Sequence, residues 1–342
     1  MLRINMFSSA DKVKGQGVGS AYTELVNMLN KHFSTEFDIS INKYSQADIS
    51  HYHTVDPQFY LSTFHKKKRG ITIGYVHFLP ETLEGSLNLF SPFKKIFDWY
   101  LISFYGKMDQ LVVVNPTFIP KLVAAGLKEE RITYIPNFVS NKKFYEATPE
   151  EKKSWREKYK IAEDRLVILG TGQIQQRKGI DDFVQLAIDN PDVQFIWAGG
   201  FSFGKITDGY DRYKKIYDNP PDNLLFTGIV DREEIMRLYN LADIFLLPSY
   251  NELFPMSILE AFNCGTPVML RDLELYHAII DNQYISTQDI DDMNDAIEMI
   301  RKKPEILEEY QQKSRKSALY YSEENVAKIW YDYYKKNAKE EK

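Results

Sequence analysis

The first half of the chain alternates short apolar runs with amphipathic stretches. The clearest helical pattern covers residues 21–33, where apolar positions recur every three to four residues. The runs that predict strands lie at residues 2–8, 37–44, 47–55, 70–78, 109–115 and 131–139. Because strands that alternate with helices build parallel sheets, this half predicts a doubly wound α/β domain.

The same alternation starts again after a polar stretch at residues 140–164. Helical patterns cover residues 179–190, 231–242, 254–265 and the C-terminal segment. Predicted strands lie at residues 166–172, 193–200, 224–228, 243–249 and 266–270. We therefore expect a Rossmann-like domain at 1–155, a second at 156–320, and a helix at 321–342 that returns to the first domain. Two such domains that face each other would hold two ligands across a central cleft.

Composition narrows the class of protein. The single cysteine, Cys264, excludes an intramolecular disulfide framework and favours a reducing compartment. No run approaches the roughly 18 apolar residues of a spanning helix, so we expect a soluble or peripheral protein. Residues 1–140 carry 15 Lys and Arg against 12 Asp and Glu, whereas the remainder carries 28 against 36. A net charge of −5 without a strong basic stripe argues against a nucleic-acid partner.

Two loops have residues suited to a phosphate. The segment GQGVGS, with Gly15, Gly17 and Gly19, follows the first strand and precedes a helix. The segment GTGQIQQRKGI places Arg177 and Lys178 just before a helix. Glycines that admit backbone N–H groups, and cations at a strand's carboxyl end, suit a diphosphate. Each segment taken alone is equally consistent with an ordinary turn.

Two carboxylates stand eight residues apart in the apolar segment NELFPMSILEAFNCGTPV. Ser257 and Glu260 fit an S-x-x-E capping box, which would give Glu260 a structural role. Capping leaves Glu252 unexplained, and an unpaired buried carboxylate is costly. Ionised carboxylates accept hydrogen bonds and do not donate them, so such a pair could bind the hydroxyls of a ribose or hexose.

Together these segments resemble the retaining glycosyltransferases of family four. NELFPMSILEAFNCGTPV resembles their E-x7-E segment, GTGQIQQRKGI their strand and KG loop, NLADIFLLPS their Ala-Asp strand, and RITYIPNFV their IPNGV turn. The order and spacing match over roughly residues 2 to 335. The resemblance implies the GT-B fold, in which two Rossmann-like domains face a cleft.

The resemblance also implies roles for particular residues. Glu260 would bind the ribose of a UDP-sugar, Glu252 the hydroxyls of the donor hexose, and Lys178 the diphosphate. His77, in GYVHF, would lie close to the reacting sugar, although a strand-end histidine with a structural role is the alternative. The implied catalytic residues are Glu252, His77 and Lys178. The implied donor-binding residues are Gly17, Gln173, Arg177, Lys178, Phe254, Met256, Ser257 and Glu260.

Two positions depart from the family pattern. Gln173 stands where the family usually has an arginine, so one cation is missing and Arg177 is the candidate to compensate. Phe138 replaces the usual glycine of IPNGV, which would narrow the cleft. The implied reaction is hexose transfer with retention, in which positive charge stabilises the leaving diphosphate. IDDF and IDDM read as helix starts rather than metal motifs, so we expect no cofactor and no required metal.

The first half also offers a candidate membrane surface. FHKKKRG is a basic cluster, and residues 91–107 place Phe93, Ile96, Phe97, Tyr100, Leu101 and Phe104 at helical spacing beside lysines. Aromatic side chains flanked by lysines suit an anionic membrane, although a core-packed helix is the alternative. The predicted membrane or acceptor residues are Lys66, Lys67, Lys68, Arg69, Lys94, Lys95, Phe97 and Trp99.

INMFSSADKVKGQGVGSAYTELV and GQIQQRKG look like the bacterial glycolipid synthases of this family. These add a second hexose, often galactose, to monoglucosyl-diacylglycerol for membrane glycolipid or lipoteichoic acid anchors, which would place the chain at the cytoplasmic face of the plasma membrane. Glucosyl transfer to diacylglycerol, or transfer to a polysaccharide or teichoic acid, stays open. A non-catalytic glycosyltransferase-like partner, which Gln173 favours, and a nucleotide-sugar 2-epimerase also stay open.

Overall fold

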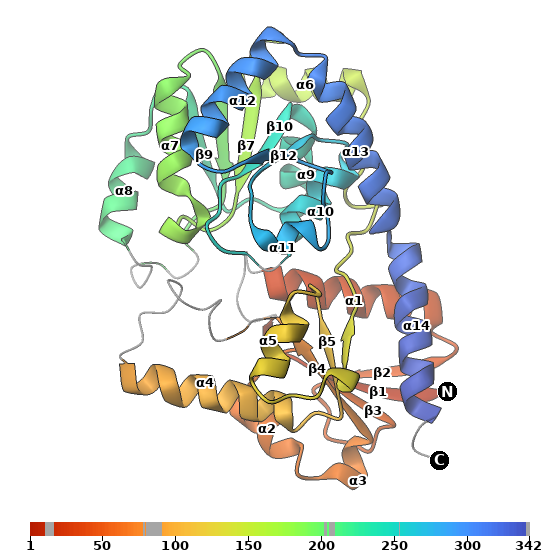
Figure 1. Ribbon diagram of the computed structural model, residues 1–342. Helices are drawn as coiled ribbons and strands as arrows, with labels where there is room; N and C mark the ends of the chain where they lie inside the picture. The colour runs from red at the N-terminus through yellow and green to blue at the C-terminus, as the bar shows by residue number, and fades with distance from the viewer. Residues whose placement is uncertain are drawn as a thin grey trace. The chain divides into compact units, whose positions relative to one another are not determined.

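The structure is a computed structural model that describes residues 1–10, 17–77, 79, 91–201, 204, 209–252 and 254–339. The chain forms two compact units. The first contains Met1–Phe138 and Glu323–Lys342, and the second contains Val139–Ser322. Figure 1 shows both units, and each is described by itself below.

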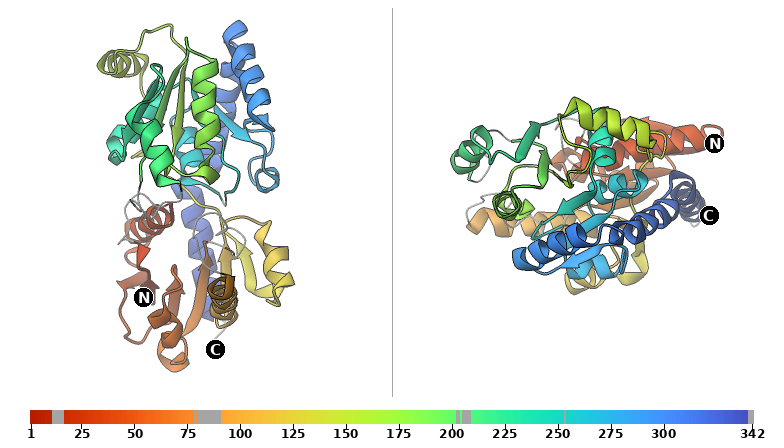
Figure 2. Two further views of the ribbon diagram at one scale, coloured as in Figure 1. Left: turned by 90° about the vertical axis from the view of Figure 1, so that its left-hand side faces the viewer. Right: turned by 90° about the horizontal axis from the view of Figure 1, so that it is seen from above.

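The first unit is built on a six-stranded parallel sheet in the order β2-β1-β3-β4-β5-β6. The strands are β1 (Leu2–Phe7), β2 (Phe37–Ile41), β3 (Ile49–Tyr52), β4 (Ile71–Val76), β5 (Gln110–Val113) and β6 (Ile132–Tyr134). The helical segments are α1 (Gly17–Phe33), α2 (Pro57–Ser62), α3 (Lys66–Arg69), α4 (Ser91–Gly106), α5 (Phe118–Ala124), η3 (Glu129–Arg131) and α14 (Glu323–Lys339). Figure 2 shows helices on both faces of the sheet.

The C-terminal helix α14 belongs to the first unit, as the sequence predicted. It lies beside α1, which is visible in Figure 1, and buries Trp330 and Tyr334. The hydroxyl of Tyr334 lies 2.7 Å from Nδ1 of His51 on β3. Glu323, at the start of α14, forms an ion pair with Lys31 at the end of α1. Residues far apart in sequence therefore complete one core.

The second unit has its own six-stranded parallel sheet, in the order β12-β11-β10-β7-β8-β9. The strands are β7 (Val167–Thr171), β8 (Gln194–Ala198), β9 (Leu224–Gly228), β10 (Ile244–Leu247), β11 (Val268–Arg271) and β12 (Ile285–Thr287). The helical segments are α6 (Pro149–Lys158), η4 (Gln176–Lys178), α7 (Ile180–Asp189), α8 (Tyr210–Asp218), α9 (Arg232–Leu241), α10 (Met256–Asn263), α11 (Glu274–His277), α12 (Ile290–Lys302) and α13 (Ile306–Tyr320). The prediction of two doubly wound parallel sheets is confirmed.

The boundary between the units lies elsewhere than the sequence predicted. The polar residues 139–155 were expected to close the first domain, but they belong to the second unit. Thr148 and Glu151 form a capping box that starts α6. Arg156 of α6 donates to the carbonyl oxygen of Leu241 and pairs with Asp243. Because polar contacts rather than apolar burial attach α6 to α9, its composition resembled that of a linker.

Within the described residues, no helix is long and apolar enough to cross a membrane.

Candidate functional site

A tight turn between β7 and α7 fixes the position of Lys178. Gly179 adopts a left-handed conformation with φ of 69°. A Cβ atom at this position would lie 2.2 Å from the carbonyl oxygen of Pro248, at the end of β10. Glycine is therefore required both by its backbone angle and by the close approach of β10. The glycine of the KG pair is thus required where the turn after β7 packs against the end of β10.

Lys178 and Glu252 form a buried ion pair across two loops. Nζ of Lys178 lies 2.5 Å from Oε1 of Glu252, and their side chains are 13% and 7% exposed. Burial lowers the pKa of Lys178, and the Glu252 carboxylate partly offsets this effect. Each charge keeps the other from being unpaired in a low-dielectric site. The loops after β7 and β10 thus bring together the two residues that the sequence placed in the catalytic set.

Arg177 and Gln173 lie in the loop that carries Lys178. Nη1 of Arg177 donates to the carbonyl oxygen of Asn251 at 3.4 Å. The Arg177 charge also lowers the pKa of Lys178, so the two cations are close enough to interact. Gln173 accepts a hydrogen bond from the side chain of Gln175 at 2.7 Å. This turn therefore concentrates two positive charges beside Glu252.

The Glu260 carboxylate contacts residues of a neighbouring helix and does not cap its own helix. Helix α10 begins at Met256 after the N-cap Pro255, and within the described residues no side chain caps it. The alternative capping box of Ser257 and Glu260 is therefore wrong. The hydroxyl of Tyr239 donates to Oε2 of Glu260 at 3.0 Å, and Arg232 lies 3.6 Å from Oε1. Two residues of α9, which the sequence did not single out, thus orient this carboxylate.

The other predicted donor residues lie at the start of α10. Phe254 and Met256 are buried, and the ring of Phe254 packs edge-on against Tyr321 at 5.2 Å. Ser257 is half-buried in the first helical turn. Backbone N–H groups in the first turn of a helix have no intrahelical partner, and they favour anions. This part of α10 suits a phosphate or sugar by its backbone rather than by its side chains.

In the first unit, His77 belongs to a cluster of three buried histidines. His77 follows β4, while His51 and His53 lie on and after the adjacent strand β3. Burial lowers the pKa of His77 and of His51 to about 3, and that of His53 well below its usual value. In the part of the chain that the structure describes, both ring nitrogens of His53 and Nε2 of His77 have no hydrogen-bond partner. The sequence spacing H-x-H at residues 51–53 was a signal for the two histidines that we did not predict.

Gly17 is the first residue of α1, where the sequence placed it. Residues 11–16, which include Gly15, lie outside the described residues. At Gly19 a Cβ atom would meet the carbonyl oxygen of Ala10 at 2.8 Å, so α1 starts close to the end of β1.

The basic cluster at residues 66–69 is divided by the fold. Lys66, Lys67 and Lys68 are exposed on α3. Arg69 is 1% exposed, and Nη2 donates to the carbonyl oxygens of Tyr44 and Ser45. The prediction that Arg69 faces a membrane is therefore wrong, because its guanidinium satisfies backbone acceptors inside the unit.

Helix α4 buries part of the aromatic stripe that the sequence offered as a membrane surface. Leu101 and Phe104 are buried, and Tyr100 donates to the carbonyl oxygen of Val55 at 2.6 Å, so much of the aromatic stripe is core. Phe97 is half-buried. Ile96 and Trp99 are 63% and 69% exposed, and Lys95 beside them is exposed. The side chain of Lys94 lies outside the described residues.

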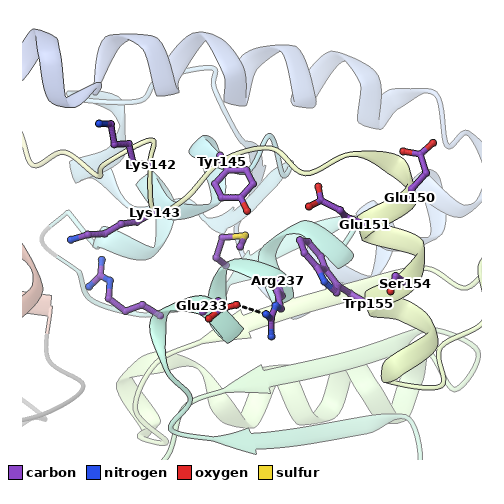
Figure 3. A pocket seen from close by; sticks show the side chains of 11 residues that line it. Lys142, Lys143, Tyr145, Glu150, Glu151, Ser154, Trp155, Glu233 and Arg237 are labelled. Carbon is purple, nitrogen blue, oxygen red and sulfur yellow. Dashed lines mark hydrogen bonds and ion pairs between the residues drawn. The ribbon is translucent and has the colours of Figure 1, made fainter.

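A hollow of about 730 Å³ lies in the second unit, beside α6 and α9. Figure 3 shows Tyr145 and Trp155 lining it, with Lys142 and Lys143 at one end and the ion pair of Glu233 and Arg237 below. Arg232 also lines the hollow, and its guanidinium lies 5.3 Å from the ring of Phe144. Arg232 therefore borders both this hollow and Glu260.

Within the described residues, no group of three or more His, Cys, Asp or Glu side chains is placed to hold a metal ion. Among the described residues, Lys178 and Arg177 supply positive charge beside Glu252.

Comparison with known proteins identifies the family. Residues 24–143 match the glycosyltransferase family 4, and residues 151–317 match the glycosyl transferases group 1. A protein from Streptococcus pneumoniae named alpha-galactosylglucosyldiacylglycerol synthase is 50% identical over 337 residues, which cover 98% of this chain and 90% of that protein. The chain belongs to the family 4 glycosyltransferases. A second member, the processive diacylglycerol alpha-glucosyltransferase of Acholeplasma laidlawii, is 30% identical over 52% of each chain.

Solved glycosyltransferase structures share this fold. A sucrose-phosphate synthase from Thermosynechococcus elongatus matches with a TM-score of 0.79 over 98% of this chain and 99% of its own, at 16% identity. The Anabaena protein HepE in complex with UDP-glucose matches with a TM-score of 0.78 at 12% identity, over 98% of this chain and all of its own. The expected GT-B fold is thereby confirmed.

Proposed function

We propose that this glycosyltransferase moves a hexose from a UDP-sugar to a glucosyl-diacylglycerol glycolipid, with retention of the anomeric configuration. Galactose is the favoured hexose. The observation that carries the proposal is the 50% identity, over 98% of the chain, to a protein named alpha-galactosylglucosyldiacylglycerol synthase. The buried ion pair of Lys178 and Glu252 supports the proposal, because the resemblance to the family gives both residues a role at the donor.

In the proposed reaction, the second unit binds the donor. Glu260, oriented by Tyr239, accepts hydrogen bonds from the ribose hydroxyls. Glu252 accepts hydrogen bonds from the hexose hydroxyls. Lys178 and Arg177 stabilise the negative charge that grows on the diphosphate as the glycosidic bond breaks. Charges fixed in a buried site act without reorganisation, and removing one such donor typically costs about 10²–10³ in kcat.

Retention follows from attack on the same face that the diphosphate leaves. A retaining glycosidase would need two carboxyl groups about 5 Å apart around the scissile bond. In the described part of the second unit, Glu252 is instead paired with Lys178, and Glu260 with Tyr239 and Arg232. We propose that the leaving phosphate itself accepts the proton of the acceptor hydroxyl.

The resemblance also assigns His77 to the reacting sugar. Burial keeps the pKa of His77 at about 3, so its imidazole is neutral at pH 7. A neutral ring can accept a hydrogen bond from a sugar hydroxyl at one nitrogen and donate one at the other.

We further infer that transfer requires no divalent cation. Lys178 and Arg177 supply fixed positive charge where a metal ion would otherwise neutralise the diphosphate. Transfer at an unchanged rate in EDTA supports this inference, and a requirement for added Mg²⁺ or Mn²⁺ contradicts it.

A lipid acceptor places the reaction at a membrane surface, and we propose the cytoplasmic face of the plasma membrane. The first unit exposes Leu61 and Phe64 near Lys66–Lys68, and Ile96 and Trp99 near Lys95. Lys107 lies 4.8 Å from the ring of Phe64, and Tyr60 of α2 lies 2.9 Å from Ser103 of α4, so these elements pack together. Exposed apolar side chains among lysines suit an anionic membrane.

The proposal is tested by a transfer assay on the purified protein. UDP-galactose and UDP-glucose are each offered with monoglucosyl-diacylglycerol in anionic mixed micelles, with EDTA present. A diglycosyl lipid supports the proposal, and NMR of its new linkage reports the anomeric configuration. Failure to transfer either sugar by a protein that binds UDP contradicts it and favours a non-catalytic partner. Sugar nucleotide isomerisation without lipid would favour an epimerase.

A second candidate is glucosyl transfer to diacylglycerol itself. The 30% identity to a protein named processive diacylglycerol alpha-glucosyltransferase favours it, although that match covers 52% of this chain. Replacing the acceptor by diacylglycerol in the same assay separates the two candidates, because only this second candidate predicts a monoglucosyl product.

A further inference from the structure

The loop that carries Glu252 is attached to the loop that carries Lys178 by its backbone. The N–H group of Tyr250 donates to the carbonyl oxygen of Arg177 at 2.9 Å. In return, the Arg177 side chain donates to the carbonyl oxygen of Asn251. These two contacts lie directly beside the Lys178–Glu252 ion pair. The relative position of the two charges therefore depends on how the β10 loop is held.

A cluster of three side chains also contacts that loop. Arg271, at the end of β11, has a side chain that is 10% exposed, and its Nη2 lies 2.5 Å from Oδ2 of Asp182. Its guanidinium lies 4.2 Å from the centre of the Tyr250 ring. The hydroxyl of Tyr250 donates to the same Asp182 oxygen at 2.6 Å. Arg271 also donates to the carbonyl oxygen of Pro248 at 3.2 Å.

The positions of these residues along the chain link the cluster to the ion pair. Asp182 lies in the first turn of α7, four residues after Lys178. Tyr250 lies two residues before Glu252. Arg271 is joined in turn to the carbonyl oxygen of Gln288, after β12. The cluster therefore ties the two loops that carry the charges to two further strands of the sheet.

We propose that Asp182, Tyr250 and Arg271 are positioning residues that set Glu252 against the sugar of the donor. This inference rests on the proposed function, which assigns the hexose contact to Glu252. A displacement of about 1 Å at a reacting centre can cost about 10²-fold in rate, so such a support contributes even though it does not touch the sugar.

The test measures how tightly each variant binds the UDP-sugar relative to UDP. Tyr250→Phe removes one hydroxyl from a side chain that is 52% exposed, so the fold should be retained. We expect UDP-galactose to bind about fivefold more weakly, because a less well placed Glu252 makes a weaker hydrogen bond to the hexose, with UDP affinity unchanged. Tyr159→Phe is the matched control, because it removes a hydroxyl that donates to Glu234 elsewhere in the second unit. A purely structural role would lower the melting temperature without changing the ratio of the two affinities.

A double-mutant cycle assigns the effect to Glu252. If Tyr250 acts through Glu252, then Tyr250→Phe has no further effect on UDP-galactose binding in the Glu252→Gln background. An equal effect in both backgrounds, or wild-type binding by Tyr250→Phe, overturns the inference while leaving the proposed function standing. Wild-type transfer by Glu252→Gln overturns the role of Glu252 in the proposed function, and with it this inference.

Discussion

At the scale of single residues, the site is defined by how each carboxylate is paired. Glu252 is paired with a lysine, whereas Glu260 accepts from the hydroxyl of Tyr239 and lies 3.6 Å from Arg232. A buried charge without a partner would cost several kcal/mol, so each pairing offsets part of the cost of burying a carboxylate. The sequence identified both glutamates and Lys178 because they stand in spaced motifs. The sequence did not predict Tyr239 and Arg232, because they reach Glu260 only through the packing of α9 against α10.

The first prediction separates the two glutamates. Glu260→Gln should weaken UDP binding about tenfold, because a charged acceptor for the ribose is lost, while leaving kcat at saturating donor within a few-fold of wild type. The variant should also bind UDP and 2′-deoxy-UDP with similar affinity, whereas the wild type should prefer UDP. Isothermal titration calorimetry measures these affinities. An undiminished preference for UDP in the variant would place the ribose elsewhere.

At the scale of elements, Lys178, Glu252 and His77 lie in segments that follow the carboxyl ends of strands β7, β10 and β4. Gly179 ends the turn after β7, and His77 comes directly after β4. Hydrophobic periodicity predicted these strands, because parallel strands buried on both faces read as continuous apolar runs. It could not predict which face of α4 is buried, since Phe97, Tyr100 and Trp99 are all aromatic. The contact of Tyr100 with Val55, far away in sequence, decides that face.

The second prediction concerns the turn at Gly179. Gly179→Ala should destabilise the protein and weaken UDP binding, because the new Cβ would meet the carbonyl oxygen of Pro248 in addition to the backbone strain. Gly126→Ala is the control. Gly126 has φ of 93°, but within the described residues nothing lies within 4 Å of its Cβ position, so strain alone of about 1 kcal/mol is expected. Equal melting temperatures for the two variants would contradict the packing argument.

The third prediction concerns acid stability and the histidine cluster. The pKa values of His51 and His77 are about 3 in the fold, against 6.5 when unfolded. The unfolded chain therefore binds more protons between pH 6.5 and 3, and stability should fall as the pH drops through this window, by up to about 2 kcal/mol for each histidine at pH 5. Urea unfolding at pH 7, 6 and 5 measures this slope.

Two histidine variants separate the buried cluster from the exposed histidines. His51→Phe should make the dependence on pH shallower, because an apolar ring cannot take up a proton in either state. His65→Gln changes an exposed histidine and should leave the slope as it is in the wild type. A slope unaffected by His51→Phe would show that other groups set the acid sensitivity.

At the scale of the whole molecule, the chain builds two units of the same architecture from a repeated pattern. The sequence predicted both sheets, whereas the strand β12 was missed because its three residues are too short to show a period. The boundary was misplaced because the polar composition of α6 hides its attachment through Arg156. The charge difference between the halves agrees with the proposed division of roles, in which the second unit would bind the donor and the first would contact the lipid.

The fourth prediction tests the proposed lipid surface. Trp99→Ala should reduce binding of the protein to vesicles containing anionic lipid, because an apolar side chain that is 69% exposed is removed. Ile188→Ala, in the second unit, removes an apolar side chain that is 54% exposed and should leave binding unchanged. Salt at 1 M, where the Debye length is about 3 Å, should weaken binding further if the lysines contact lipid head groups. Equal binding by the two variants would contradict the assignment of this surface.

The rate of hexose transfer by Glu252→Gln beside the wild type, with UDP affinity measured on the same samples, decides whether Glu252 contacts the donor sugar. Transfer should fall by about 10²-fold or more while UDP binding stays within a few-fold, because the proposed contact of the lost charge is with the sugar and not with the nucleotide. Transfer at the wild-type rate, with UDP still bound, would contradict the assignment of Glu252 to the donor sugar.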